Sequence, residues 1–162
     1  MSLKVGRKAS RTARITAEHV RLYSQITGDY NPLHVDSEFT AATRFKKRIV
    51  QGGLTSGLLN AIVAMDLPGP GTVFLETCWR FTNPVFIGDT IAGEVEILEV
   101  HKTKPVSRIG VRIVRSDGET VLEGHAWCYT ARPSSFRHHA RQDSARVVRP
   151  NRHRTWRASR SA

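Results

Sequence analysis

The chain has 162 residues, of which 40% are hydrophobic, so we expect one domain with a core of ordinary size and a tail. Its formal net charge of +11 would fit a nucleic-acid-binding protein, but the charge is concentrated at the two ends. Residues 133–162 carry eight arginines and one aspartate, and residues 1–14 carry five further basic residues, which leaves the remainder slightly acidic. This distribution argues against nucleic acid as the partner of the folded domain.

The two ends of the chain differ in composition from its middle. The N-terminus is basic without an apolar run, which argues against a secretory signal and leaves an arginine-rich transit peptide as the lesser alternative. Residues 133–162 have few large apolar side chains and no periodicity, so we expect a disordered, solvated basic tail, with electrostatic binding of RNA or an acidic partner as the alternative. We interpret the isolated Cys78 and Cys128 as reduced, buried thiols of a cytoplasmic protein rather than a disulfide or zinc ligands.

A strand and a helix are predicted before residue 30. Residues 12–16 form the short strand, and Thr16 is a suitable N-cap for a helix over residues 17–27. Apolar side chains recur along one side of this helix, at Val20, Tyr23 and Ile26. Gly28 ends the helix.

Residues 29–34 are predicted to form an ordered loop, because Pro32 disfavours helical geometry at the residue before it. Asp36 is a suitable N-cap for a second short helix that ends near Arg44. A basic loop over residues 44–48 then leads to the next element.

Residues 52–65 are predicted to form the central helix of the fold. This stretch has no charge and no proline and is apolar nearly all round, so it should be covered nearly all round, and it is shorter than the about 20 residues that cross a bilayer. One stripe is small or polar, at Gly53, Gly57, Asn60 and Ala64. Gly57 indicates a close approach, either of a strand or of a bound ligand, and a buried amide at Asn60 would need a hydrogen-bond partner.

Four strands are predicted after a Pro-Gly break, over residues 73–81, 90–100, 106–115 and 120–130. In the first of them, the residues with odd numbers from Val73 to Phe81 are expected to share one face. A turn at Asp117-Gly118 joins the last two strands, and such hairpins favour antiparallel pairing.

A twisted antiparallel sheet wrapped around the helix at 52–65 is the simplest way to bury that helix, so we predict an α+β fold with a single domain at residues 1–132. The sequence has no second helical layer to cover the sheet edges. We therefore expect a homodimer that joins two sheets, or a dimer of such dimers.

Asp29 and His34 are the candidate catalytic residues. They are a carboxylate and an imidazole in one ordered loop beside the central helix, and such a pair can act as general base and general acid on one substrate. The alternative is that Asp29 only caps or closes a turn.

Gly52 and Gly53 are the candidate oxyanion site. Their backbone N–H groups lie at the positive end of the helix dipole with no side chain in the way, which suits the enolate oxygen of a thioester. The alternative is a flexible start of the helix. Common nucleotide-binding, serine-hydrolase and metalloprotease motifs are absent, and neither a metal nor a resident cofactor is expected.

The run from Thr27 to His34, TGDYNPLH, resembles the D-x-N-P-x-H signature of MaoC-like dehydratases, which include (R)-specific enoyl-CoA hydratases. The resemblance covers roughly residues 10–131 and continues through Phe45, Ile49-Val50, Gly52, the break at 67–71 and residues 84–89.

The resemblance implies a hotdog fold, a dimer with active sites at the subunit interface, Asp29 and His34 as the catalytic pair, and an amide of Gly52 at the thioester carbonyl. Gln51 stands where the family often has histidine, and Asn60 stands where some hydratases carry a serine that orients the aspartate. We expect Asn31, Gln51 and Asn60 to support the catalytic pair.

The expected function is reversible hydration of a trans-2-enoyl thioester, carried on coenzyme A or acyl carrier protein, to the (3R)-hydroxyacyl thioester. Asp29 would take a proton from water while His34 delivers one to Cα, or the two roles are exchanged. The alternatives are a hotdog thioesterase, a non-catalytic acyl-thioester binder and an RNA binder that acts through the tail.

Overall fold

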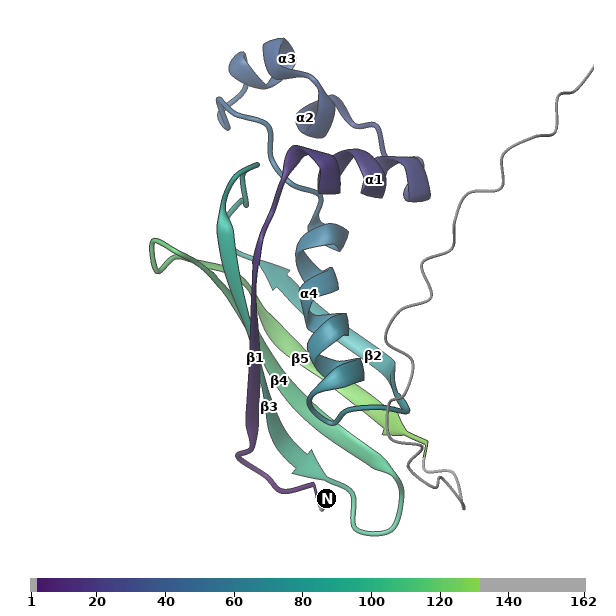
Figure 1. Ribbon diagram of the computed structural model, residues 1–162. Coiled ribbons are helices and arrows are strands. Elements are labelled where there is room, and N and C mark those ends of the chain that lie inside the picture. Colours follow the sequence, from purple (N-terminus) through teal and green to yellow (C-terminus); the bar gives the residue numbers. More distant parts are fainter. Residues whose placement is uncertain (1–2, 132–162) are drawn as a thin grey trace, which may run out of the picture. The chain divides into compact units, whose positions relative to one another are not determined.

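The computed structural model describes residues 3–131, and the predicted tail lies outside the described residues. The helices and strands of the described part are, in order, β1 (Lys8–Arg14), α1 (Ala17–Thr27), α2 (Pro32–Val35), α3 (Ser37–Ala41), α4 (Gly52–Met65), β2 (Thr72–Phe81), β3 (Thr90–Val100), β4 (Val106–Arg115) and β5 (Thr120–Thr130). The strands form one antiparallel sheet in the order β1-β3-β4-β5-β2, which curves around α4 (Figure 1). None of the helices in residues 3–131 is both long and apolar enough to cross a membrane.

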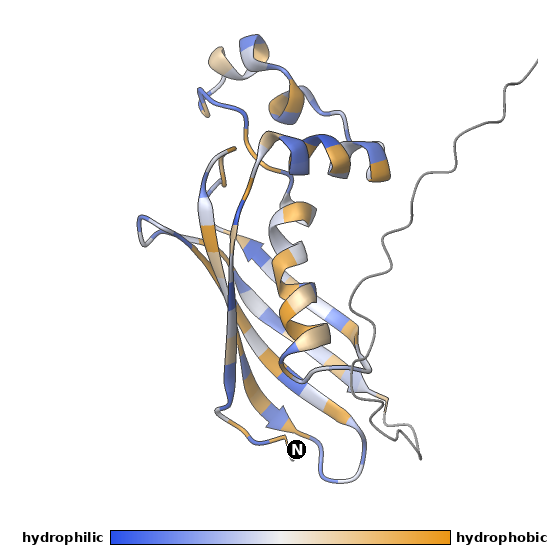
Figure 2. Ribbon diagram, in the orientation of Figure 1, coloured by the Kyte–Doolittle hydropathy of each residue, from blue (hydrophilic) through white to orange (hydrophobic). Residues whose placement is uncertain are grey.

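The hydrophobic core lies between α4 and the face of the sheet that α4 covers. Leu59, Ile62 and Val63 of α4 are almost completely buried. They belong to one cluster with buried strand residues, which include Ile91, Val95, Ile97, Ile109, Ile113, Leu122, Ala126 and Cys128. Figure 2 shows the hydrophobic residues along α4 and their alternation with polar residues along the strands. Burial of one such aliphatic side chain contributes about 1.5–3 kcal/mol, so packing on the sheet is what holds α4 in place.

Strand β3 approaches α4 closely at Gly93, and of the two alternatives for Gly57, the close approach of a strand is wrong. A Cβ atom added to Gly93 would lie 3.1 Å from Cδ1 of Ile62 and 3.3 Å from Leu58, so glycine at this position lets β3 run close to the helix. A Cβ atom added to Gly57 would have no neighbour within 4 Å. Gly57 therefore faces open space in the single chain.

The central helix is covered on one side, not nearly all round as its composition suggested. The stripe that contains Gly53 and Asn60 is exposed, and Met65 at the C-terminal end of α4 is 56% exposed. The expected burial of Asn60 is therefore wrong for the single chain. The sheet can cover only one side of a helix, and the described residues contain no second layer for the other side.

Strand β2 departs from the predicted alternation because of a β-bulge. The register with β5 shifts between Phe74 and Glu76, so inward-facing positions change from even to odd numbers along the strand. Phe74 and Trp79 both pack against the core, with their rings edge to face at a centroid distance of 5.9 Å. Val73 and Leu75, which strict alternation placed on the same face as Trp79, are 55% and 60% exposed.

The two cysteines have different environments. Cys128 is buried, as expected, but Cys78 is exposed, so the expected burial of Cys78 is wrong. Cys78 lies on β2 after the bulge, at an edge of the sheet, where the outer face is open. Both thiols are unpaired.

Helix α1 begins and ends at the capping residues that the sequence predicted, Thr16 and Gly28. The hydroxyl of Thr16 accepts a hydrogen bond from the N–H of His19, and Nδ1 of His19 accepts one from the N–H of Thr16, which completes a capping box. Gly28 ends the helix with φ of 76° and donates its N–H to the carbonyl of Ser24.

The loop predicted at 29–34 contains one helical turn, α2. Pro32 occupies its first position, where its missing N–H costs nothing, and the side chain of Asn31 accepts from the N–H of Leu33 at 3.0 Å. Asp36 caps α3 as predicted, but α3 ends at Ala41, earlier than expected.

Candidate active site

The folded chain brings Asp29 and His34 together. Oδ2 of Asp29 lies 3.7 Å from Nε2 of His34. The side chain of His34 is 11% exposed and that of Asp29 is 42% exposed, so the imidazole is largely enclosed and the carboxylate is open to solvent. Asp29 and His34 are the candidate catalytic residues predicted from the sequence, and their side chains face one another.

Backbone contacts fix the orientation of each partner. Nδ1 of His34 donates to the carbonyl oxygen of Ile49 at 2.8 Å, so Nδ1 carries a proton and Nε2 is the atom available to Asp29 or to a substrate. The N–H of Ile49 in turn donates to the carbonyl of Leu33 at 3.0 Å. Oδ1 of Asp29 accepts from the N–H of Asn31 at 3.2 Å, which leaves Oδ2 free to face the imidazole. Asp29 can therefore close the turn through Oδ1 and still take part in catalysis through Oδ2.

The N-terminus of α4 lines the same cavity as the imidazole of His34. His34, Gly52 and Thr55 line a cavity of about 270 Å³, together with residues of the loop before α4 and of the end of β2. Gln51 is the N-cap of α4 but makes no side-chain capping bond, so the first N–H groups of the helix have no acceptor there. An oxygen that binds at Gly52 would thus lie in the same cavity as the imidazole.

Two aromatic side chains flank the glycines at the start of α4. A Cβ atom on Gly52 would lie 3.0 Å from Cζ of Phe81, and one on Gly53 would overlap the hydroxyl of Tyr23. A side chain at Gly53 would therefore force Tyr23 to move, whereas one at Gly52 would need a shift of the Phe81 ring by a few tenths of an ångström. Phe81 and Tyr23 were not predicted to lie beside the site. The sequence indicated only that Tyr23 is on the apolar side of α1 and that Phe81 is on one face of a strand.

The expected supporting residues are not all near the pair. Asn31 caps α2 and its backbone holds Oδ1 of Asp29. Gln51 is buried and its Nε2 donates to Oγ of Ser24 at 2.9 Å, which ties the start of α4 to α1, while its Oε1 has no partner among the described residues. Asn60 lines an apolar groove between α1 and α4 and makes no hydrogen bond to Asp29 within this chain.

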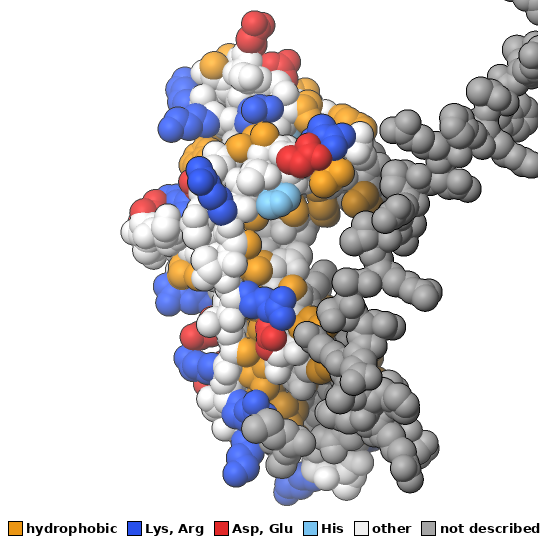
Figure 3. All heavy atoms as spheres, viewed as in Figure 1, with side chains coloured by type: hydrophobic (Ala, Val, Ile, Leu, Met, Phe, Trp, Pro, Cys, Tyr) orange, Lys and Arg blue, Asp and Glu red, His pale blue; other side chains and the backbone are white. Residues whose placement is uncertain are grey.

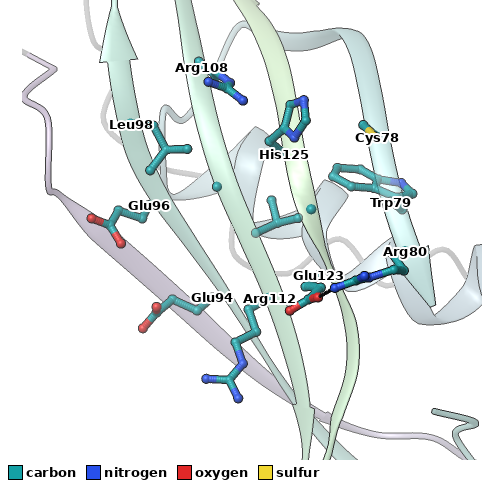
Figure 4. Close-up of a pocket in the computed structure, with 13 residues that line it drawn as sticks. Cys78, Trp79, Arg80, Glu94, Glu96, Leu98, Arg108, Arg112, Glu123 and His125 are labelled. Atoms are coloured by element: carbon teal, nitrogen blue, oxygen red, sulfur yellow. Dashed lines mark hydrogen bonds and ion pairs between the residues drawn. The ribbon is translucent and has the colours of Figure 1, made fainter. Parts of the chain in front are cut away.

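A larger hollow of about 560 Å³ lies on the outer face of the sheet, away from these residues (Figure 4). Among its charged side chains Arg80 pairs with Glu123, while Glu94 and Glu96 pair with Lys8, which does not line the hollow. The Glu94 and Glu96 carboxylates raise the pKa of Lys8. This hollow contains none of the candidate catalytic residues. Within residues 3–131 no group of three or more His, Cys, Asp or Glu side chains is arranged to hold a metal ion.

The chain is similar to known proteins of one family. A model of the MaoC-like domain family matches residues 2–117. The chain is 36% identical over 125 residues to the (R)-specific enoyl-CoA hydratase of Aeromonas caviae, an alignment that spans 77% of this chain and 93% of the relative. It is 31% identical to a mitochondrial 3-hydroxyacyl-[acyl-carrier-protein] dehydratase of Solanum lycopersicum, over 76% of this chain and 75% of the relative.

The fold is similar to that of a solved (R)-hydratase from A. caviae that is involved in PHA biosynthesis. The TM-score is 0.77 with 35% sequence identity, and the match covers 80% of this chain and 98% of the solved one. The hotdog fold that the sequence resemblance implied is thereby confirmed for the described residues.

Proposed function

The chain belongs to the MaoC-like dehydratase family, and we propose that it adds water reversibly to a trans-2-enoyl thioester to give the (3R)-hydroxyacyl thioester. Its relatives named above are hydro-lyases that act on acyl-CoA or acyl-carrier-protein thioesters. The observation that carries the proposal is the pairing of Oδ2 of Asp29 with Nε2 of His34 across 3.7 Å, with the imidazole oriented by the Ile49 carbonyl.

A water molecule that hydrogen-bonds to both Oδ2 and Nε2 is the nucleophile in this scheme. Its oxygen forms a bond to Cβ of the enoyl group while one member of the pair takes its proton. The Cα–Cβ π electrons move toward Cα and the carbonyl, and the enolate oxygen is stabilised by the free N–H of Gly52. The other member of the pair then protonates Cα, so that one water is added across the double bond.

Besides the proton on Nδ1 of His34, the pair must hold one transferable proton for this cycle. With Nδ1 committed to the Ile49 carbonyl, His34 can deliver a proton only from Nε2, which requires an imidazolium beside an Asp29 carboxylate. If the roles are exchanged, neutral His34 accepts the water proton at Nε2 and protonated Asp29 delivers one to Cα. In either order the proton passes back between Oδ2 and Nε2 to restore the starting state. One loop presents both groups to a single face of the alkene, which favours a single stereoisomer of the product.

The deciding experiment is to incubate the purified chain with crotonyl-CoA while following the enoyl absorbance and free thiol separately. We expect the absorbance to fall without release of thiol, and the product to be the (3R)-alcohol on chiral analysis. Release of coenzyme A thiol would identify a thioesterase instead. No change in either signal, with crotonyl-CoA bound, would identify a non-catalytic thioester-binding protein.

We further propose that the active form is a homodimer. The support is the outer edge of β2, where Val73, Leu75 and Phe81 are each more than half exposed, together with the uncovered side of α4. Large apolar side chains at an unpaired strand edge are a usual site of association.

We also propose a cytoplasmic location for the protein. The support is that Cys78 and Cys128 are both free thiols, as is usual in a reducing compartment.

A further inference from the structure

The loop between α3 and α4 carries an unneutralised positive charge. Four of the five residues from Arg44 to Arg48 are basic, the exception being Phe45. None of these four side chains forms an ion pair with any residue in the range 3–131. Elsewhere in the fold several basic residues are paired, namely Lys8, Arg11, Arg21, Arg80 and Arg115. A group of like charges without counter-charges on the same chain attracts an anionic ligand.

This loop also forms part of the wall of the candidate active site. Arg44 and Phe45 line the cavity that contains His34 and Gly52, and Arg44 is the only basic residue among the described residues that line it, apart from the histidine. The guanidinium of Arg44 lies 4.9 Å from the ring centroid of Phe45, which holds the charge against the cavity wall. The loop turns sharply at Lys46, whose φ is 62°. Positive charge and reacting groups thus share one cavity.

We propose that the side chains of the loop 44–48 bind the phosphate groups of coenzyme A while the thioester lies at Gly52. This inference rests on the proposed hydratase function. In an acyl-CoA the pantetheine arm separates the thioester from the pyrophosphate and the 3′-phosphate, so the phosphates lie outside the reaction cavity. Arg44 at the cavity wall and the exposed Lys46 and Lys47, which follow Phe45 in the chain, meet that requirement.

The surroundings of the loop favour a compact phosphate group over an acidic carrier protein. Helix α3 lies directly before the loop in the chain and exposes Asp36 and Glu38. Figure 3 shows acidic as well as basic side chains at the end of the molecule that carries α3. An acidic protein surface broad enough to cover the loop would also meet these carboxylates, and like charges in contact disfavour binding. A small polyanion can contact the lysines and arginines alone.

The test compares crotonyl-CoA with crotonyl-pantetheine, which has the same thioester but no phosphate. The variant Lys46→Gln/Lys47→Gln removes two exposed charges of the loop. The matched control Lys102→Gln/Lys104→Gln removes two exposed charges in the β3–β4 connection, at the opposite end of the molecule (Figure 1). We expect the ratio of the KM for crotonyl-CoA to the KM for crotonyl-pantetheine to rise about tenfold in the loop variant, as two contacts worth about threefold each are lost. The control should keep the wild-type ratio.

Three outcomes would overturn the inference. The first is an equal rise of KM for both thioesters, the second is the same change of ratio in the control, and the third is a larger rise for crotonyl-acyl carrier protein than for crotonyl-CoA. A wild-type chain that hydrates neither small thioester would instead refute the proposed function. The loop is then tested by calorimetric titration with free coenzyme A, in which the loop variant must bind more weakly than the control for the inference to stand.

Discussion

The hydroxyl of Tyr23 on α1 occupies the space in which a side chain at Gly53 on α4 would have to begin. The two residues are 30 positions apart in the sequence, and their contact sets how closely α1 lies over the first turn of α4. Gly53 is thus constrained by Tyr23 as well as by any role of its N–H group.

Gly53→Ala should therefore destabilise the chain, because the Tyr23 ring must move. Overpacking of this kind costs about 1–3 kcal/mol of the free energy of unfolding. In a Tyr23→Leu background the same substitution should be neutral or slightly stabilising, since alanine favours helix over glycine by up to about 1 kcal/mol. Urea unfolding of the four proteins of this cycle measures the coupling, and additive effects would show that the two residues do not compete for space.

Asp29→Asn and His34→Ala should each reduce turnover of crotonyl-CoA by at least about a hundredfold with the fold preserved, since general acid–base assistance contributes about 10²–10⁴-fold. The double variant should be hardly slower than either single one, because the two groups handle one proton together. Steady-state rates on variants with native circular dichroism make the comparison. If either single variant kept most of its activity, the pair would have only a structural role in the turn.

The two cysteines should react very differently with thiol reagents. Burial raises the pKa of Cys128 from 9.0 to about 11, whereas Cys78 is exposed. At neutral pH we expect one thiol per folded chain to react with Ellman's reagent and two after unfolding. Reaction of both thiols in the native protein would show that the sheet opens at β5 on the timescale of the assay.

The shifted pKa also links stability to pH. A folded pKa above the unfolded value means that the folded chain holds this proton more tightly, so the stabilisation is complete below about pH 9 and is lost as the pH rises to about 11. Cys128→Ala should flatten this part of the plot of unfolding free energy against pH. An unchanged slope in the variant would assign the dependence to other groups.

Asn60→Leu should leave the free energy of unfolding within about 0.5 kcal/mol of wild type, because the side chain is exposed and its amide has no hydrogen-bond partner among residues 3–131. Thermal unfolding of the two proteins measures this. A large loss of stability would show that the amide is engaged in the assembled protein.

Association through β2 should be sensitive to charge at its edge. Val73→Lys/Leu75→Lys places two charges on side chains that are 55% and 60% exposed in the single chain, so folding should persist while the dimer dissociates. Sedimentation velocity at micromolar concentration compares the variant with wild type. A variant that remains dimeric would place the interface elsewhere.

Local signals in the sequence were enough to locate most elements. Thr16 and Gly28 define the ends of α1 through contacts within three or four residues, and the charge-free run of α4 contrasts with its surroundings. Asp29 and His34 could be selected because the loop between them is short and Pro32 restricts it.

Features that depend on distant contacts were not predictable in the same way. The bulge at Leu75 changes which residues of β2 face inward, and no local pattern marks it. The sequence could not decide between a strand and a bound ligand at Gly57, or indicate the close approach at Gly93, because a glycine does not show which element approaches it. The proximity of Tyr23 and Phe81 to the start of α4 likewise depends on how α1 and β2 pack, and the burial of Asn60 depends on the rotation of α4.

The N–H of Ile49 donates to the carbonyl of Leu33 and the carbonyl of Ile49 accepts from Nδ1 of His34, only three residues before α4 begins at Gly52. The proposed proton-transfer pair and the candidate oxyanion donors are thus joined by a backbone spacer of fixed length. Changes in length within residues 49–52 should be tolerated poorly in natural or designed variants. The neighbouring loop at 44–47 lies outside this spacer and can vary in length and charge while the reacting groups keep their separation.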